Sequence, residues 1–215
     1  HGDVPVMNVS HTTVDCTMTD HYAAEYIDDL DMLKTNIDEK NLAAQAGAAA
    51  LGRKTDSLIT TAMDTTTSTQ AHASTGHTKA KAHTAFETLG DNDVPDDAQR
   101  FWVTSHAGWS DLMDVNEFAQ AEYVVTSELP YSHGMVAKRW HGFFVFAFSG
   151  LDKSGNIRKT FAYHTTSMGH GIGRDVSQDI TWQGQKQAHL VVNKMSQGSV
   201  LIDANGIIEV SIDES

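Results

Sequence analysis

The sequence predicts an α+β fold, in which helices come early in the chain and antiparallel strands come late. Three observations support this prediction. The stretch Thr35–Asp64 has the pattern of one long helix, a short helix–strand region follows it, and the chain then continues as a succession of strand-like segments. A length of 215 residues suits one domain or two small ones.

The stretch Thr35–Asp64 is the element around which we expect the rest of the chain to be arranged. Small and apolar residues recur along it at steps of three, four or seven, and it contains no proline. Thr35 or Asn36 can cap its first turn, followed by the acidic residues of a capping box. At ~1.5 Å per residue the helix would be about 40 Å long, more than a small domain needs, which indicates a spine. Gly52 costs about 1 kcal/mol relative to alanine, so we expect it to mark a close packing contact that Gly52→Leu would overpack.

Before this helix, residues 1–30 carry β-branched residues at alternate places. This pattern indicates an extended ribbon or hairpin, and Pro5 argues against a central strand. Such a ribbon has few apolar side chains of its own, so it needs a partner surface in its own domain or in another copy. The acidic run Asp28, Asp29 and Asp31 then leads into the helix and is typical of a solvated surface.

After the long helix, the composition predicts a small α/β layer. Residues 65–78 are polar and lack a core pattern, which indicates a surface loop. Lys79–Leu89 has a helical pattern with Gly90 just past its end. Arg100–Thr104 has the pattern of a buried strand, and a short helix bearing Trp109 follows it.

The remainder of the chain has the sequence pattern of a β-sheet. Trp140–Gly150 is apolar on both faces of an extended strand, which predicts a central strand. The pair Asn205-Gly206 is a strong hairpin signal between two apolar segments. The further strands are expected at Arg158–Tyr163, Asp175–Trp182, Ala188–Ser196, Ser199–Asp203 and Ile207–Ile212.

Charge and composition exclude several classes of function. Fifteen basic and 28 acidic residues give a formal charge of −13, and no basic cluster is present, which argues against tight nucleic-acid binding. The sequence has no apolar run of membrane-spanning length. Its single cysteine, Cys16, cannot form an internal disulfide and favours a reducing compartment.

Twelve histidines invite a search for a metal or catalytic site. His72, His77 and His83 are spaced by five and six residues, which suits no single helix face. His164 and His170 border a glycine-rich run that does not follow the dinucleotide fingerprint. The sequence also lacks a phosphate-binding loop, a nucleophile elbow and a His-Glu-x-x-His motif. We therefore expect no catalytic residue, metal or cofactor. The alternative from another class is a metal hydrolase that uses His164 and His170.

Five motifs, in order along the chain, resemble one branch of the major capsid proteins of tailed bacteriophages, which have the Hong Kong 97 fold. They are His1-Gly2-Asp3-Val4-Pro5-Val6-Met7, the acidic segment Ala24–Asp31, the set Leu51, Gly52, Arg53, Asp56 and Ile59, the run from Asn92-Asp93-Val94-Pro95-Asp96-Asp97 to Arg100, and Met195-Ser196-x-Gly198 to Ile202-Asp203. The resemblance implies an extended loop at residues 1–30, a peripheral domain with the spine helix at 31–85, an axial domain at 86–165, and peripheral-domain strands at 166–215. It places His1 to Met7 in assembly and the Leu51–Ile59 set in packing of the spine helix. The N-terminal arm of the family is expected to be missing here.

The resemblance implies a structural protein, not an enzyme, that assembles through pentamers and hexamers into an icosahedral shell around the double-stranded DNA of a phage. Its partners would be many copies of itself, with portal, scaffolding and decoration proteins. An acidic shell wall would repel packaged DNA, leaving only non-specific contact. The protein would be located in the virion and assembled in the cytoplasm of the bacterial host, without membrane contact. The nearest alternative with the same fold is an encapsulin-type compartment shell.

Overall fold

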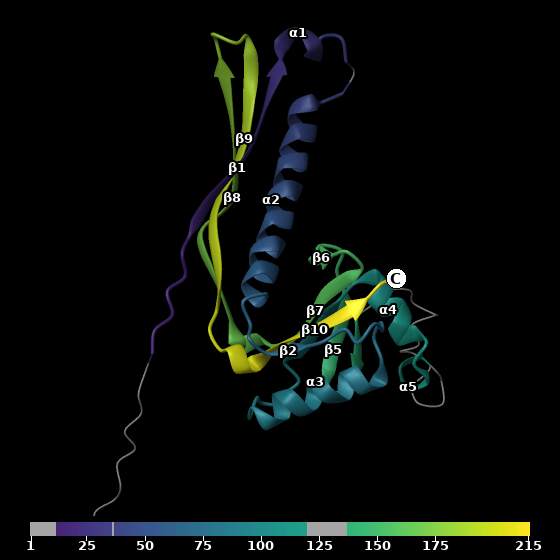
Figure 1. Ribbon diagram of the computed structural model, residues 1–215. Coiled ribbons are helices and arrows are strands. Elements are labelled where there is room, and N and C mark those ends of the chain that lie inside the picture. The colour runs from purple at the N-terminus through teal and green to yellow at the C-terminus, as the bar shows by residue number, and fades with distance from the viewer. Residues whose placement is uncertain (1–11, 36, 120–136) are drawn as a thin grey trace, which may run out of the picture.

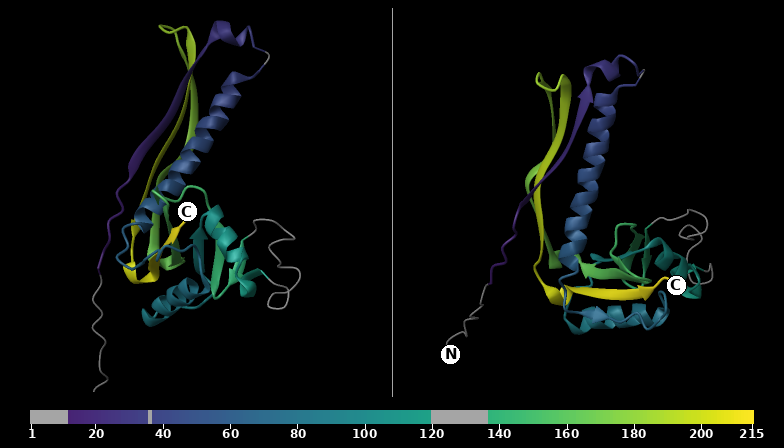
Figure 2. Two further views of the ribbon diagram at one scale, coloured as in Figure 1. Left: turned by 45° about the vertical axis from the view of Figure 1, so that its right-hand side comes forward. Right: turned by 45° about the horizontal axis from the view of Figure 1, so that its top comes forward.

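The computed structural model describes residues 12–35, 37–119 and 137–215. The chain forms a mixed α+β structure, as the sequence predicts. It is built in two parts, an elongated arm and a compact unit (Figure 1). The arm is a long helix lying along a three-stranded sheet, and the compact unit contains a seven-stranded sheet with shorter helices packed against it. Further views show the arm projecting away from the compact unit (Figure 2).

The arm contains the longest helix and the longest strands of the described chain. Its sheet has the order β1-β9-β8 and is antiparallel throughout, with β9 between its two neighbours. The short helix α1 leads from β1 toward the long helix α2 at the far end of the arm (Figure 1). The bounds are β1 Thr19–Asp28, α1 Asp29–Met32, α2 Glu39–Met63, β8 Met168–Gln183 and β9 Ala188–Leu201.

Helix α2 packs on the central strand of the arm sheet. Ile27 from β1, Ala44 from α2 and Val191 from β9 form one apolar cluster. Farther along the helix, the hydroxyl of Thr55 donates a hydrogen bond to Oε1 of Gln197 at 2.7 Å. The contact is therefore apolar near the far end of the arm and partly polar nearer the compact unit.

The start of α2 differs from the expected one. The N-cap is Asp38, whose carboxylate accepts a hydrogen bond from the backbone N–H of Asn41, rather than Thr35 or Asn36. Thr35 instead donates its hydroxyl to the carboxylate of Glu39 at 2.9 Å. Asp38 caps well because its oxygen satisfies an otherwise unpaired N–H of the first turn and its charge suits the helix dipole.

The compact unit is organised by its sheet, in the order β2-β10-β7-β3-β5-β4, with β6 paired to β7. Strand β3 is parallel to β5 and antiparallel to β7. One face packs on α3 and α4 through a core that includes Leu89, Trp102, Leu112 and Phe143. The bounds are β2 Thr69–Gln70, α3 Lys79–Asp91, β3 Arg100–Thr104, α4 His106–Met113, α5 Asn116–Ala119, β4 Lys138–Trp140, β5 Phe143–Ala147, β6 Lys153–Ser154, β7 Ile157–His164 and β10 Ile207–Asp213.

The Asn205-Gly206 hairpin prediction is wrong. Ala204–Gly206 is a 3₁₀ turn, and the strands on its two sides belong to different sheets. Strand β9 already has β1 and β8 as neighbours, so it has no free edge for β10, which pairs with β7 instead. The C-terminal strand β10 therefore belongs to the compact unit.

Three other segments refine the expected elements. Trp140–Gly150 is divided between β4 and β5 by a turn at His141 and Gly142, whose φ angles are 51° and 82°. Helix α3 continues through Gly90 to Asp91. Within residues 1–30, β1 finds its partner surface in its own arm by pairing with β9.

Candidate functional site

The residues that the sequence assigned to assembly and packing are only partly described. His1 to Met7 lie outside the described residues. Leu51 is 4% exposed and faces the arm sheet, and Ile59 packs against the apolar cluster at the base of the helix. Arg53 and Asp56 are exposed. The motif therefore contributes two packing residues and two surface residues, in addition to Gly52.

The expected packing contact at Gly52 is wrong. Gly52 is exposed, and a Cβ added to it would have nothing within 4 Å. The close contact lies instead at Gly47, where an added Cβ would be 2.1 Å from Nδ2 of the buried Asn193 in β9. The glycine that allows α2 to approach the sheet is therefore Gly47.

Gly52→Ala is expected to raise the free energy of unfolding by about 0.5–1 kcal/mol, because alanine restricts the unfolded chain and adds no clash in the helix. Urea unfolding of the unassembled subunit would measure the change. The matched variant Gly47→Ala should lower stability by about 1–3 kcal/mol, since Asn193 has to move. A loss of stability in Gly52→Ala would show that this site is packed.

His77 is a buried histidine in the compact unit. Its Nε2 lies 2.7 Å from the hydroxyl of Thr104, and its backbone N–H donates to Asp111 at 3.0 Å. Its Nδ1 has no hydrogen-bond partner within the described structure. Burial, assisted by the charge of Lys81, lowers the pKa of His77 to about 3. The side chain is therefore a neutral part of the core.

The ammonium group of Lys81 lies in a cage of backbone carbonyls. The oxygens of His72, Thr75, Gly76 and Ser211 lie 2.8 to 3.1 Å from its Nζ. Lys81 is only 5% exposed, and burial lowers its pKa. One side chain thus links the loop before α3 to strand β10.

Glu214 forms a second buried ionic cluster, just after β10. It accepts hydrogen bonds from Ser105 at 2.6 Å and Arg158 at 3.1 Å, and pairs with Lys153 at 2.7 Å. Burial alone would raise the pKa of Glu214, but these donors outweigh it and lower the value to about 2. The cluster stabilises the compact unit by linking β7 and the start of α4 to the end of β10.

Of the other described histidines, His83 and His141 lie 3.0 Å apart, while His164 and His170 each have separate partners. His164 is 1% exposed and lies between Asp97, at 3.0 Å, and Thr166, at 2.7 Å. His170 is exposed on β8 and contacts Ser199. In residues 12–35, 37–119 and 137–215, no group of three or more His, Cys, Asp or Glu side chains could hold a metal ion.

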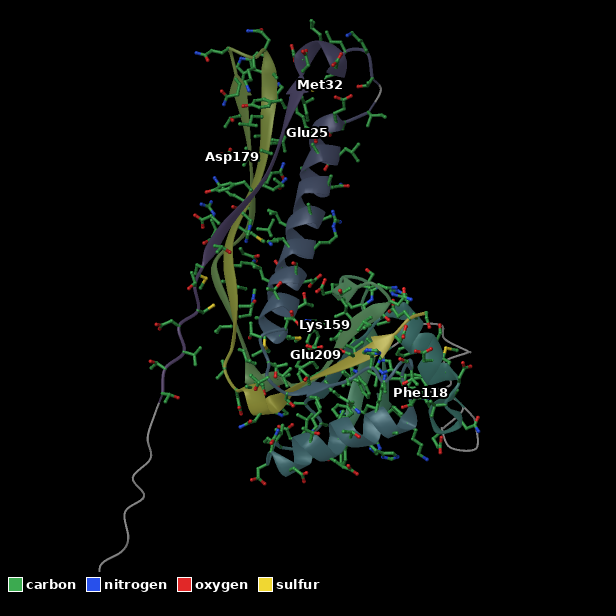
Figure 3. All side chains as sticks on the ribbon, in the orientation of Figure 1. Glu25, Met32, Phe118, Lys159, Asp179 and Glu209 are labelled. Atoms are coloured by element: carbon green, nitrogen blue, oxygen red, sulfur yellow. The ribbon has the colours of Figure 1, made fainter. Side chains whose placement is uncertain are left out.

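Charged side chains meet at the junction between the arm and the compact unit, beside the apolar cluster at the base of α2. Lys159 of β7 pairs with Asp64 at the end of α2 and lies 3.8 Å from Glu209 of β10. Figure 3 shows Lys159 and Glu209 at this junction. Beside them is a mostly apolar hollow of about 160 Å³ that Ile59, Tyr163 and six other residues line.

The exposed apolar surface is concentrated on the arm. In the part of the chain that the structure describes, every large exposed apolar side chain belongs to the arm, to the segment leading into it or to the link that leaves it. The set is Val14, Met18, Tyr22, Tyr26, Leu30, Leu33, Ile37, Leu42, Ile172, Val176, Ile180, Trp182 and Ile202. Apolar surface gathered on one part of a protein is typical of a contact surface.

The far end of the arm is also acidic. Carboxylates of Glu25, Asp28, Asp31 and Glu39 line a hollow there beside apolar side chains such as Leu42. Figure 3 labels Glu25 and Met32 at this end. The arm thus combines apolar and charged groups in a way that suits recognition of a protein surface.

Comparison with known proteins gives one family match. A model of a family described as phage capsid protein matches residues 1–214. A search of curated protein sequences finds no significant match. None of the helices in the described ranges is long and apolar enough to cross a membrane.

Solved structures with the same fold include three informative ones. A structure from Mycobacterium phage Che8 has a TM-score of 0.73 at 13% identity, covering 89% of this chain and 70% of its own. The capsid of cyanophage P-SCSP1u has a TM-score of 0.70 at 13% identity, covering 100% and 80%. An encapsulin from Synechococcus elongatus has a TM-score of 0.63 at 6% identity, covering 93% and 75%.

Proposed function

The chain belongs to the phage capsid protein family, and from this premise we propose that its arm is the peripheral domain and its compact unit the axial domain of a capsid subunit. The protein is a structural capsid protein with the Hong Kong 97-like fold and a component of the virion. In this division β10 joins α3 and β3 in the axial domain, because it pairs with β7 there. The peripheral domain keeps α2, β1, β8 and β9.

Copies of the subunit associate, in this proposal, into pentamers and hexamers that close an icosahedral shell around double-stranded DNA. The observation that carries it is the concentration of exposed apolar side chains on the arm, with Tyr22 67% exposed and no large apolar side chain exposed in the described compact unit. Residues before β1 act as the extended loop that reaches a neighbouring copy. The formal charge of −13 suits a wall that contacts packaged DNA only non-specifically.

Assembly would take place in the cytoplasm of the bacterial host, with portal, scaffolding and decoration proteins as further partners. An encapsulin-type shell remains the second candidate, because that fold is also shared. DNA protected from nuclease inside particles from the natural source supports the virus, whereas a packaged protein cargo supports the compartment.

The test is electron microscopy of the purified full chain, together with sedimentation velocity. Closed particles tens of nanometres across are expected. Tyr22→Asp should reduce their yield by placing a charge on the arm surface, while Thr84→Asp, on the exposed side of α3, should not. A species of one to a few subunits under assembly conditions would contradict the proposal.

A further inference from the structure

Two glycines lie directly opposite each other on neighbouring strands of the arm sheet. Gly171 of β8 and Gly198 of β9 are direct cross-strand partners, and neither has a side chain to fill the sheet surface between them. Their position faces away from α2, because Gln197 bonds to Thr55 of that helix and successive residues of a strand alternate between faces. The two glycines therefore form a notch on the face of the sheet opposite α2, named here the glycine notch.

The chain itself occupies the glycine notch. A Cβ added at Gly198 would lie 2.2 Å from the carbonyl oxygen of Thr17 and 3.1 Å from Sγ of Cys16. A Cβ added at Gly171 would lie 2.5 Å from the terminal methyl of Met18. The two positions differ in kind, because a methionine methyl can rotate away whereas the Thr17 carbonyl moves only with its backbone.

The segment before β1 uses this notch to cross the sheet. Residues 12–18 lie outside the strands, and the ladder with β9 begins only at Thr19. Followed back from Thr19 to residue 12, the chain passes over the sheet from the β1 side toward the β8 side and then away from the sheet (Figures 1 and 2). Contact of Thr17 with Gly198 and of Met18 with Gly171 marks this crossing.

We propose that the glycine notch fixes the direction in which the segment before β1 leaves the subunit, so that it meets a second copy of this chain. The inference rests on the proposed function, in which that segment is the reaching loop. Val14 and Met18 are 48% and 42% exposed, which leaves apolar surface for the neighbour. At ~3.3 Å per residue, residues 12–18 alone can span roughly 20 Å. A change of about 10° at the notch would therefore displace the far end of this span by about 3.5 Å, roughly one residue length.

Cys16 offers a direct readout of the seated segment, because it is the only cysteine of the chain and lies beside the notch. Its reaction with Ellman's reagent is measured on unassembled subunits, beside the thermal midpoint and the yield of closed particles. Gly198→Ala should increase the exposure of the half-buried thiol and speed its reaction about two- to fivefold through local opening of the segment. The same variant should lose closed particles. Gly171→Ala should show a smaller change in both.

Gly173→Ala is the matched control on the same sheet, because its added Cβ would meet only ordinary contacts from 3.4 Å outward. It should leave the thiol rate and the particle yield unchanged. A second control separates the effect of the substitution on the notch from its effect on the sheet. In a chain lacking residues 1–18, Gly198→Ala should leave the free energy of unfolding unchanged, since Thr17 is absent.

Each outcome decides the inference. Thiol reactivity and particle yield in Gly198→Ala equal to those of the unaltered chain would overturn it. An equal loss of thermal midpoint with and without residues 1–18 would also overturn it, because Gly198 would then serve the sheet alone. If the unaltered chain forms no particles while Gly198→Ala still exposes Cys16, the proposed function fails and the seating of the segment stands.

Discussion

Lys81→Met is expected to lower the free energy of unfolding by about 3–5 kcal/mol, because it leaves buried backbone carbonyls without a donor. Four carbonyl oxygens lie within 3.1 Å of the Lys81 ammonium group. Methionine has a similar length, so packing changes little while all of these hydrogen bonds are lost. Urea unfolding followed by circular dichroism would measure the difference.

Lys79→Met is the matched control on the same helix. Lys79 is half-exposed and pairs with Glu117 on the surface, a type of interaction that contributes about 0–1 kcal/mol. The two substitutions remove the same charge two positions apart, so only the buried cage distinguishes them. Equal effects of the two variants would show that the carbonyls around Lys81 obtain other donors, such as water.

The main elements could be predicted because each has a clear local signal. The long helix follows from its regular apolar spacing, and α2 ends at Met63, one residue before the predicted end. Strand β3 matches the predicted Arg100–Thr104, because a short run with aromatic and β-branched residues between polar segments favours a buried strand. The α+β class follows from these two kinds of signal together.

Other features depend on contacts between distant segments and have no local signal. A lysine in a helix ordinarily indicates a surface position, so the cage around Lys81 becomes visible only once the loop before α3 and strand β10 are placed. Asn205-Gly206 favours a hairpin locally, but the two strands beside it join different sheets.

The candidate site also has some features with a local sequence signal and others that depend on contacts between distant segments. The set that the resemblance places in helix packing contains Leu51 and Ile59, which are packed in the structure, and Arg53 and Asp56, which are exposed. Which glycine of α2 approaches the sheet depends on the opposite strand, so Gly47 was missed and Gly52 was chosen instead. The glycine notch was missed for the same reason, since the pairing of Gly171 with Gly198 is a property of register. The motif from Met195 to Gly198 contains one of the two glycines of the notch, Gly198.

Removal of residues 1–18 is expected to leave a folded subunit that does not close shells. The extended loop expected at residues 1–30 includes β1, and a deletion through all of it would remove a strand that pairs with β9. The cut before Thr19 keeps the whole arm sheet and removes only the segment proposed to reach a neighbour. The free energy of unfolding should change by about 1 kcal/mol or less, because most of the described part of this segment is exposed. Electron microscopy and urea unfolding measure the two properties separately.

Removal of residues 1–28 is the deletion to compare with removal of residues 1–18. It also takes away β1, which opens one edge of β9 and removes Ile27 from the cluster with Ala44 and Val191. Stability should then fall by about 3 kcal/mol or more, and the exposed edge should favour aggregation. Closed particles of normal size from the chain lacking residues 1–18 would contradict the role of the reaching segment. Failure of both deletions to fold would instead show that the segment before β1 stabilises the arm itself, since the shorter cut leaves every strand of the sheet in place.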